Sequence, residues 1–121
     1  MSVFLPPLAG TAHEARAVAT DACLRWHVEH LVGPACLVAS ELVTNAVQHA
    51  ETTMTMRLSL VGDHLLVEVE DGCVRPPMLR PLPAPTDPAP GRGLVLVART
   101  AARSGWVPTP DGKIVWATLR R

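Results

Sequence analysis

Residues 40–50 read S-E-L-V-T-N-A-V-Q-H-A, and this stretch decides the fold. Along its edge stand Glu41, Asn45 and His49, each one helical turn after the last. The spacing leaves two interpretations open: a solvated helix flank, or the wall of a site that combines a carboxylate, an amide and an imidazole. The apolar residues around them recur at helical spacing and predict one broad buried face, made of Ala39, Leu42, Val43, Ala46, Val47 and Ala50.

The composition describes a single domain with an ordinary core. The chain has 121 residues, 48% of them hydrophobic, with a net charge of zero and only 3% aromatic residues. The charge balance and the few aromatics count against a direct nucleic-acid binder. No apolar run looks long enough to span a bilayer and no signal-peptide pattern is present, so we expect no membrane association.

The three cysteines indicate a reducing compartment. Cys23, Cys36 and Cys73 are odd in number and widely spaced, so they form neither a disulfide framework nor a CxxC metal pair. We therefore expect a cytoplasmic protein.

Helical spacing predicts three helices, at residues 12–28, 33–50 and 93–103. Thr11 and Glu14 have the spacing of a capping box, which would begin the first helix. Gly33-Pro34 begins the second, because proline suits the first turn of a helix.

Alternating hydrophobicity predicts strands between and after these helices. A clean alternation covers residues 53–61, and further strands are expected at residues 3–5, 65–70, 106–109 and 113–119. Helices and antiparallel strands in this order predict an α+β fold, a two-layer α/β sandwich.

Asp71 lies on the inward side of its strand, beyond Val69. A buried carboxylate is costly unless it has a donor. Asp71 is either a turn residue that caps Gly72, or an acceptor for a donor brought from outside, such as the exocyclic amine of an adenine.

The segment at about residues 72–92 holds seven prolines and no periodic pattern, which excludes a helix or a central strand. Loops of this length are typically lids or disordered segments. The sequence Gly91-Arg92-Gly93-Leu94 then starts a helix, where free N–H groups and the helix dipole attract anions. We expect a lid that hinges at these two glycines, or a disordered segment.

Four stretches together resemble a known family: E-L-V-T-N-A-V-Q-H-A, V-E-V-E-D-G, G-R-G-L-V-L-V and G-K-I-V-W-A. In this order they look like the histidine-kinase-like ATPase domain with the Bergerat fold. Within it they resemble the anti-sigma factors and serine/threonine kinases related to RsbW, which are abundant in actinomycetes. The resemblance extends from Ala15-Arg16 to Trp116. It implies one domain over residues 1–121, with a mixed, mainly antiparallel sheet covered on one face by helices and a Pro-rich lid at about 72–92.

The resemblance also implies an ATP site. Asn45 would hold Mg²⁺ against the nucleotide phosphates, Glu41 would act as general base, and Asp71 would accept the adenine amine. ATP and Mg²⁺ are the implied cofactors. The other residues of the implied site are His49, which would help to shape the pocket, together with Gly72, Gly91, Arg92, Gly93 and Leu94.

The adenine motif departs from the family pattern. The full motif is D-x-G-x-G, whereas residues 71–75 read D-G-C-V-R, so the later glycines are missing. This departure leaves open how tightly the chain binds ATP.

The sequence and the resemblance are compatible with two functions. The first is an ATP-dependent serine/threonine kinase of the anti-sigma class that acts in transcription regulation. Its implied partners are a sigma factor and a small anti-anti-sigma antagonist protein, with a homodimer as a further option. The alternative is a protein-binding module on the same fold, nucleotide-responsive or nucleotide-free, without kinase activity. The catalytic piece of a sensor histidine kinase is disfavoured, because no dimerisation helix with a phosphoacceptor histidine fits before residue 12.

Overall fold

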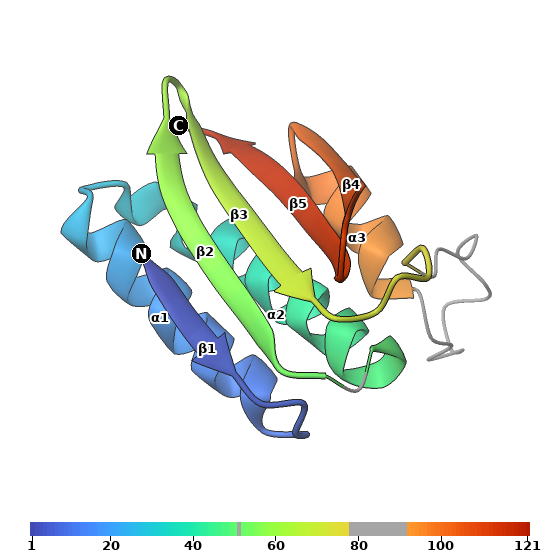
Figure 1. Cartoon of the computed structure of the whole chain (residues 1–121). Coiled ribbons are helices and arrows are strands. Elements are labelled where there is room, and N and C mark those ends of the chain that lie inside the picture. Colours follow the sequence, from blue (N-terminus) through green and yellow to red (C-terminus); the bar gives the residue numbers. More distant parts are fainter. Residues whose placement is uncertain (51, 78–91) are drawn as a thin grey trace.

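A computed structural model of the protein describes residues 1–50, 52–77 and 92–121, without the side chains of His49 and Arg92. Helices cover one face of a twisted sheet, as Figure 1 shows. In chain order the elements are β1 (Ser2–Leu5), α1 (Thr11–Arg25), the 3₁₀ turn η1 (Glu29–Leu31), α2 (Val32–His49), β2 (Met54–Val61), β3 (His64–Asp71), α3 (Arg92–Thr100), β4 (Arg103–Thr109) and β5 (Gly112–Arg120).

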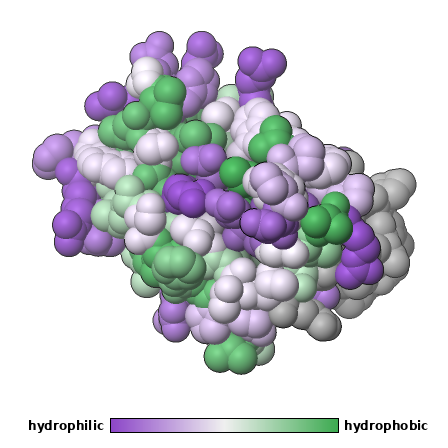
Figure 2. All heavy atoms as spheres, viewed as in Figure 1, coloured by the Kyte–Doolittle hydropathy of each residue, from purple (hydrophilic) through white to green (hydrophobic). Residues whose placement is uncertain are grey.

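The sheet confirms the predicted α+β sandwich. Its five strands have the order β1-β2-β3-β5-β4. All neighbouring pairs are antiparallel, so this part of the chain lacks the parallel pairing that a mixed sheet would have. The face of the sheet that lies away from the helices is polar across its middle, as Figure 2 shows. Arg57 of β2 and Glu70 of β3, at outward positions of their strands, form an ion pair at 2.9 Å.

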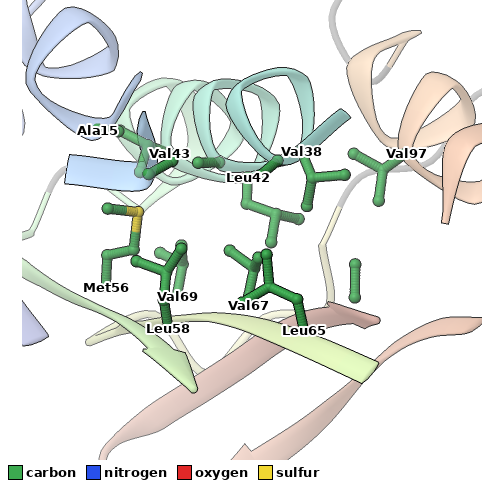
Figure 3. Packing of buried hydrophobic residues seen from close by; sticks show 14 of the residues in the cluster. Ala15, Val38, Leu42, Val43, Met56, Leu58, Leu65, Val67, Val69 and Val97 are labelled. Atoms are coloured by element: carbon green, nitrogen blue, oxygen red, sulfur yellow. The ribbon is translucent and has the colours of Figure 1, made fainter. Parts of the chain in front are cut away.

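The core lies between the sheet and α2. Val38, Leu42 and Val43 of α2 point toward the inward residues of β2 and β3, as Figure 3 shows. Side chains of this size contribute about 1.5–3 kcal/mol each when fully buried. The inward residues of β3 are Leu65, Val67, Val69 and Asp71, as the alternation predicts.

The expectation that no apolar run is long enough to span a bilayer is corrected by α2. By length and composition, the 20-residue segment Glu29–Gln48 could cross a membrane, with a mean hydropathy of 1.2. Half of this segment is buried inside the fold, where it packs against α1 and the sheet. A place in the core therefore accounts for its hydrophobicity.

Both ends of α1 differ from the prediction. The capping box is wrong: the cap residue is Gly10, and the Thr11 hydroxyl donates to the Pro6 carbonyl at 2.7 Å instead. The helix ends at Arg25, because His27 adopts a left-handed conformation with a φ of 57°. The Val28 N–H then donates to the Cys23 carbonyl at 2.9 Å, which closes the last turn.

The predicted lid lies largely outside the described residues. Of the segment at about 72–92, the structure describes residues 72–77 and 92. The helix that follows is shorter than predicted and ends at Thr100, since β4 begins at Arg103.

Candidate functional site

The candidate site lies at one end of the sandwich. The C-terminal ends of α2 and β3 meet the first residues of α3 and β5 there (Figure 1). Strand pairing places Asp71, the last residue of β3, opposite Lys113 near the start of β5.

Gly112 allows this close approach of the two strands. A Cβ atom at Gly112 would overlap the carbonyl group of Asp71. Only a residue without a side chain lets β5 begin at this distance from the end of β3. The neighbouring position then directs the Lys113 side chain inward, on the same face as Val115.

Lys113 and Asp71 form a buried ion pair. The Lys113 ammonium donates to Asp71 Oδ1 at 3.1 Å, and the two side chains are only 2% and 1% exposed. The ammonium also donates to the Cys73 carbonyl at 3.3 Å. The pair thus ties β5 to both the last residue of β3 and the segment that follows it.

The two carboxylate oxygens of Asp71 have different surroundings. Oδ1 accepts from Lys113 Nζ and from the Cys73 N–H, the latter at 2.9 Å. Oδ2 is buried and has no hydrogen-bond partner among the described residues. An unpaired buried acceptor costs about 1–3 kcal/mol, so Oδ2 is suited to a donor from a bound molecule.

The backbone after Asp71 is also held in place. The Gly72 N–H donates to the Thr52 hydroxyl at 2.9 Å, which connects the end of β3 to the segment before β2. Next to it, the pKa of the Cys73 thiol is lowered, chiefly by a side-chain hydrogen bond to Arg75 and further by the Lys113 charge. The backbone on both sides of Gly72 is therefore fixed by contacts within the fold.

The α2 side of the site holds Glu41 and Asn45, one turn apart. Asn45 is only 6% exposed, so the interpretation as a solvated flank is wrong for this residue. Burial raises the pKa of the half-buried Glu41, while Arg16 of α1 acts in the opposite direction. Within the described part of the chain, no hydrogen bond or ion pair joins either residue to Asp71.

The remaining predicted residues are described only in part. His49 is the last residue of α2, and its side chain lies outside the described atoms. Arg92 and Gly93 form the first turn of α3, whereas Gly91 is not described. Leu94 is buried at 8% exposure in the core cluster. The helix α3 thus begins at Arg92, and the free backbone N–H groups of a helix N-terminus attract anions in general.

An apolar cavity of about 220 Å³ has Leu94 in its wall. Leu42 of α2, Leu94 of α3 and Val115 of β5 contribute to its wall, and Trp106 and Trp116 lie on the β4–β5 side. None of the polar candidates Glu41, Asn45 or Asp71 lines it. The cavity wall is therefore mainly apolar, and these three polar candidates lie outside it.

Sequence reasoning missed Lys113. It is the only lysine in the chain. A usable signal was present, because Lys113, Val115, Ala117 and Leu119 alternate in one strand and the last three are apolar. That pattern places the ammonium on the core side.

Comparison with known proteins agrees with the observed fold. The sequence profile of the family described as "Histidine kinase-like ATPase domain" matches residues 5–119. A search of curated proteins finds no match. A solved structure with a similar fold is that of the RsbU and RsbW domains of Rv1364c from Mycobacterium tuberculosis, with a TM-score of 0.73 and 17% sequence identity. The similarity covers 99% of this chain but 32% of that one.

Proposed function

Because the chain belongs to the histidine kinase-like ATPase domain family, we propose that it is an ATP-binding regulatory protein of the anti-sigma-factor class. In this proposal it transfers the γ-phosphate of ATP to a serine or threonine of a partner protein. The single observation that carries the nucleotide site is the buried Oδ2 of Asp71, which has no partner among the described residues.

The adenine contact follows from the chemistry of this oxygen. The exocyclic amine of adenine is a neutral donor that satisfies a buried carboxylate oxygen without adding charge. Guanine carries a carbonyl at that place, so two acceptors would face each other. The Gly72 N–H donates to the Thr52 hydroxyl at 2.9 Å, which holds the backbone that follows Asp71.

The phosphates and Mg²⁺ are assigned to the α2 and α3 side. Asn45 offers a neutral amide oxygen, and Mg²⁺ takes only one or two protein ligands alongside phosphates and water. The first turn of α3, with Arg92 and Gly93, offers backbone N–H groups for phosphate oxygens. When bound, the metal neutralises phosphate charge during transfer.

Glu41 is assigned the role of general base. It stands one turn before Asn45 on the same helix, and its raised pKa brings it toward the range in which a base accepts a proton effectively. It would take the proton of the attacking hydroxyl of the partner. The assignment rests on helix spacing, on the pKa direction and on the family resemblance.

The partners come from the resemblance. A sigma factor and a small anti-anti-sigma antagonist are the proposed partners, and RsbW is one of the domains named in the similar structure. A homodimer and a cytoplasmic location belong to the same proposal. All three cysteines are free, in keeping with a reducing compartment.

A binding module without kinase activity is the second candidate. Two observations favour it: the missing glycines in D-G-C-V-R, and the ion pair by which Lys113 already occupies one oxygen of Asp71. In this alternative the chain would still contact its partners, and nucleotide would be a regulator or play no part.

Incubation with radiolabelled ATP, Mg²⁺ and candidate antagonist proteins separates the two. The kinase proposal expects label on a serine or threonine of one antagonist, and much slower labelling when Glu41→Gln replaces the wild type. An antagonist that binds the chain tightly and stays unlabelled supports the binding module.

A further inference from the structure

A fully buried lysine needs an explanation in this fold. Lysine is almost never completely buried unless it is paired. Lys113 is the only lysine of the chain, and the other ten basic residues are all arginines. Buried ion pairs are weak evidence for stability, because well-packed apolar residues can replace them at little or no cost. Stability alone therefore does not account for Lys113.

Lys113 contacts only one of the two carboxylate oxygens of Asp71, Oδ1. Oδ1 receives the ammonium at 3.1 Å and the Cys73 N–H at 2.9 Å. The same ammonium donates to the Cys73 carbonyl at 3.3 Å, so Lys113 also holds the backbone that supplies the second donor. Both donors reach Oδ1, and Oδ2 receives none within the described structure.

This arrangement fixes the orientation of the carboxylate. Rotation of the carboxylate about its Cβ–Cγ bond, or of the side chain about Cα–Cβ, would break the hydrogen bond from the Cys73 N–H to Oδ1. With Oδ1 held at two points, the free oxygen keeps one direction. A ligand donor then meets an acceptor that is already in place, which reduces the entropy lost on binding.

We propose that Lys113 is a positioning residue of the base site. It holds Asp71 so that Oδ2 alone faces the ligand, and it thereby sets the preference for a purine that carries an exocyclic amine. This inference rests on the proposed nucleotide site, and it assigns to Lys113 the selectivity of that site. Lys113 itself need not touch the base.

The test compares ATP with purine riboside triphosphate, which differs from ATP only in lacking the exocyclic amine. Calorimetry gives both dissociation constants for each variant. In the wild type the amine-free nucleotide should bind about tenfold more weakly or worse, because Oδ2 stays unpaired. Lys113→Met removes one of the two donors to Oδ1 and frees the Cys73 backbone that supplies the other. The dissociation constant of purine riboside triphosphate divided by that of ATP should then fall to about two or less.

Two variants serve as controls. Lys113→Arg keeps a cation and N–H donors. Its ratio of the two dissociation constants should stay close to that of the wild type. Arg57→Met removes the cation of the partly exposed ion pair with Glu70 on the outer face, and should leave the ratio unchanged. A wild-type ratio in Lys113→Met would overturn the inference.

A second readout needs no variant. Because Lys113 is the only lysine, protein labelled with ¹⁵N-lysine gives a single side-chain ammonium signal in NMR. ATP should shift this signal, since its amine shares the Asp71 carboxylate with Lys113, and purine riboside triphosphate should shift it much less. Equal shifts with both nucleotides at saturation would contradict the positioning role.

The outcomes separate this inference from the function on which it rests. A wild type that binds no ATP overturns both. A wild type that binds both nucleotides equally overturns the base contact of Asp71, and the inference with it, but leaves ATP binding standing. A high wild-type ratio that persists in Lys113→Met overturns only the role of Lys113.

Discussion

Lys113 and Asp71 lie 42 residues apart in the sequence and meet at 3.1 Å inside the fold. The contact joins β5 to the end of β3 at the point where the chain leaves the sheet for the segment after Asp71. The same carboxylate thus belongs both to the folded core and to the proposed nucleotide site.

The stability of the fold should depend on both members of this pair. Lys113→Met leaves a buried carboxylate without its counter-charge and should lower the free energy of unfolding by about 3–5 kcal/mol. Arg57→Met, which removes a cation from the partly exposed ion pair with Glu70, should cost about 1 kcal/mol or less. Urea denaturation of the two variants measures the difference, and equal losses would contradict the buried-pair account.

Gly112 should not tolerate a side chain. In Gly112→Ala the added Cβ would overlap the Asp71 carbonyl, so the start of β5 must move away from β3. We expect a loss of stability of about 1–3 kcal/mol and weaker ATP binding. Gly10→Ala is a suitable control, because nothing lies within 4 Å of a Cβ there. Similar unfolding midpoints for the two variants would argue against the close approach.

Glu41→Gln should bind ATP normally and transfer phosphate about 10²–10⁴-fold more slowly. Burial raises the pKa of Glu41, so the transfer rate of the wild type should fall as pH decreases through that raised value. The pH profile of the variant should lack this decrease. A raised carboxyl pKa stabilises the fold below the unfolded value and loses that contribution as pH rises. Glu41→Gln should therefore be at least as stable as the wild type at neutral pH. If its measured stability agrees, unfolding does not explain the slower phosphate transfer.

Asn45→Ala should remove the Mg²⁺ dependence of nucleotide binding while the fold survives. The amide is the only side chain assigned to the metal, and its replacement leaves phosphates and water as ligands. Titrations with ATP at high and zero Mg²⁺, together with circular dichroism, give both readouts. Mg²⁺-dependent affinity equal to that of the wild type would refute the metal assignment.

The sequence predicted those features that depend on local periodicity. Alternation in residues 65–70 placed Asp71 on the inward face, and its burial confirms this. The capping box failed because the Thr11 hydroxyl reached a carbonyl from the preceding turn, a contact that residue spacing does not encode. Lys113 was missed because its partner comes from a distant strand. Only the register between β3 and β5 brings the two side chains together.

Calorimetric titration of the wild type and of Asp71→Asn with ATP, in the presence of Mg²⁺, tests the central claim most directly. The account predicts saturable binding to the wild type, with ATP preferred over GTP. In the variant, binding should be at least about tenfold weaker, because the amide cannot reproduce a carboxylate held by Lys113 with one oxygen free for the amine. Equal ATP affinity in the two proteins, or GTP binding as tightly as ATP to the wild type, would contradict it.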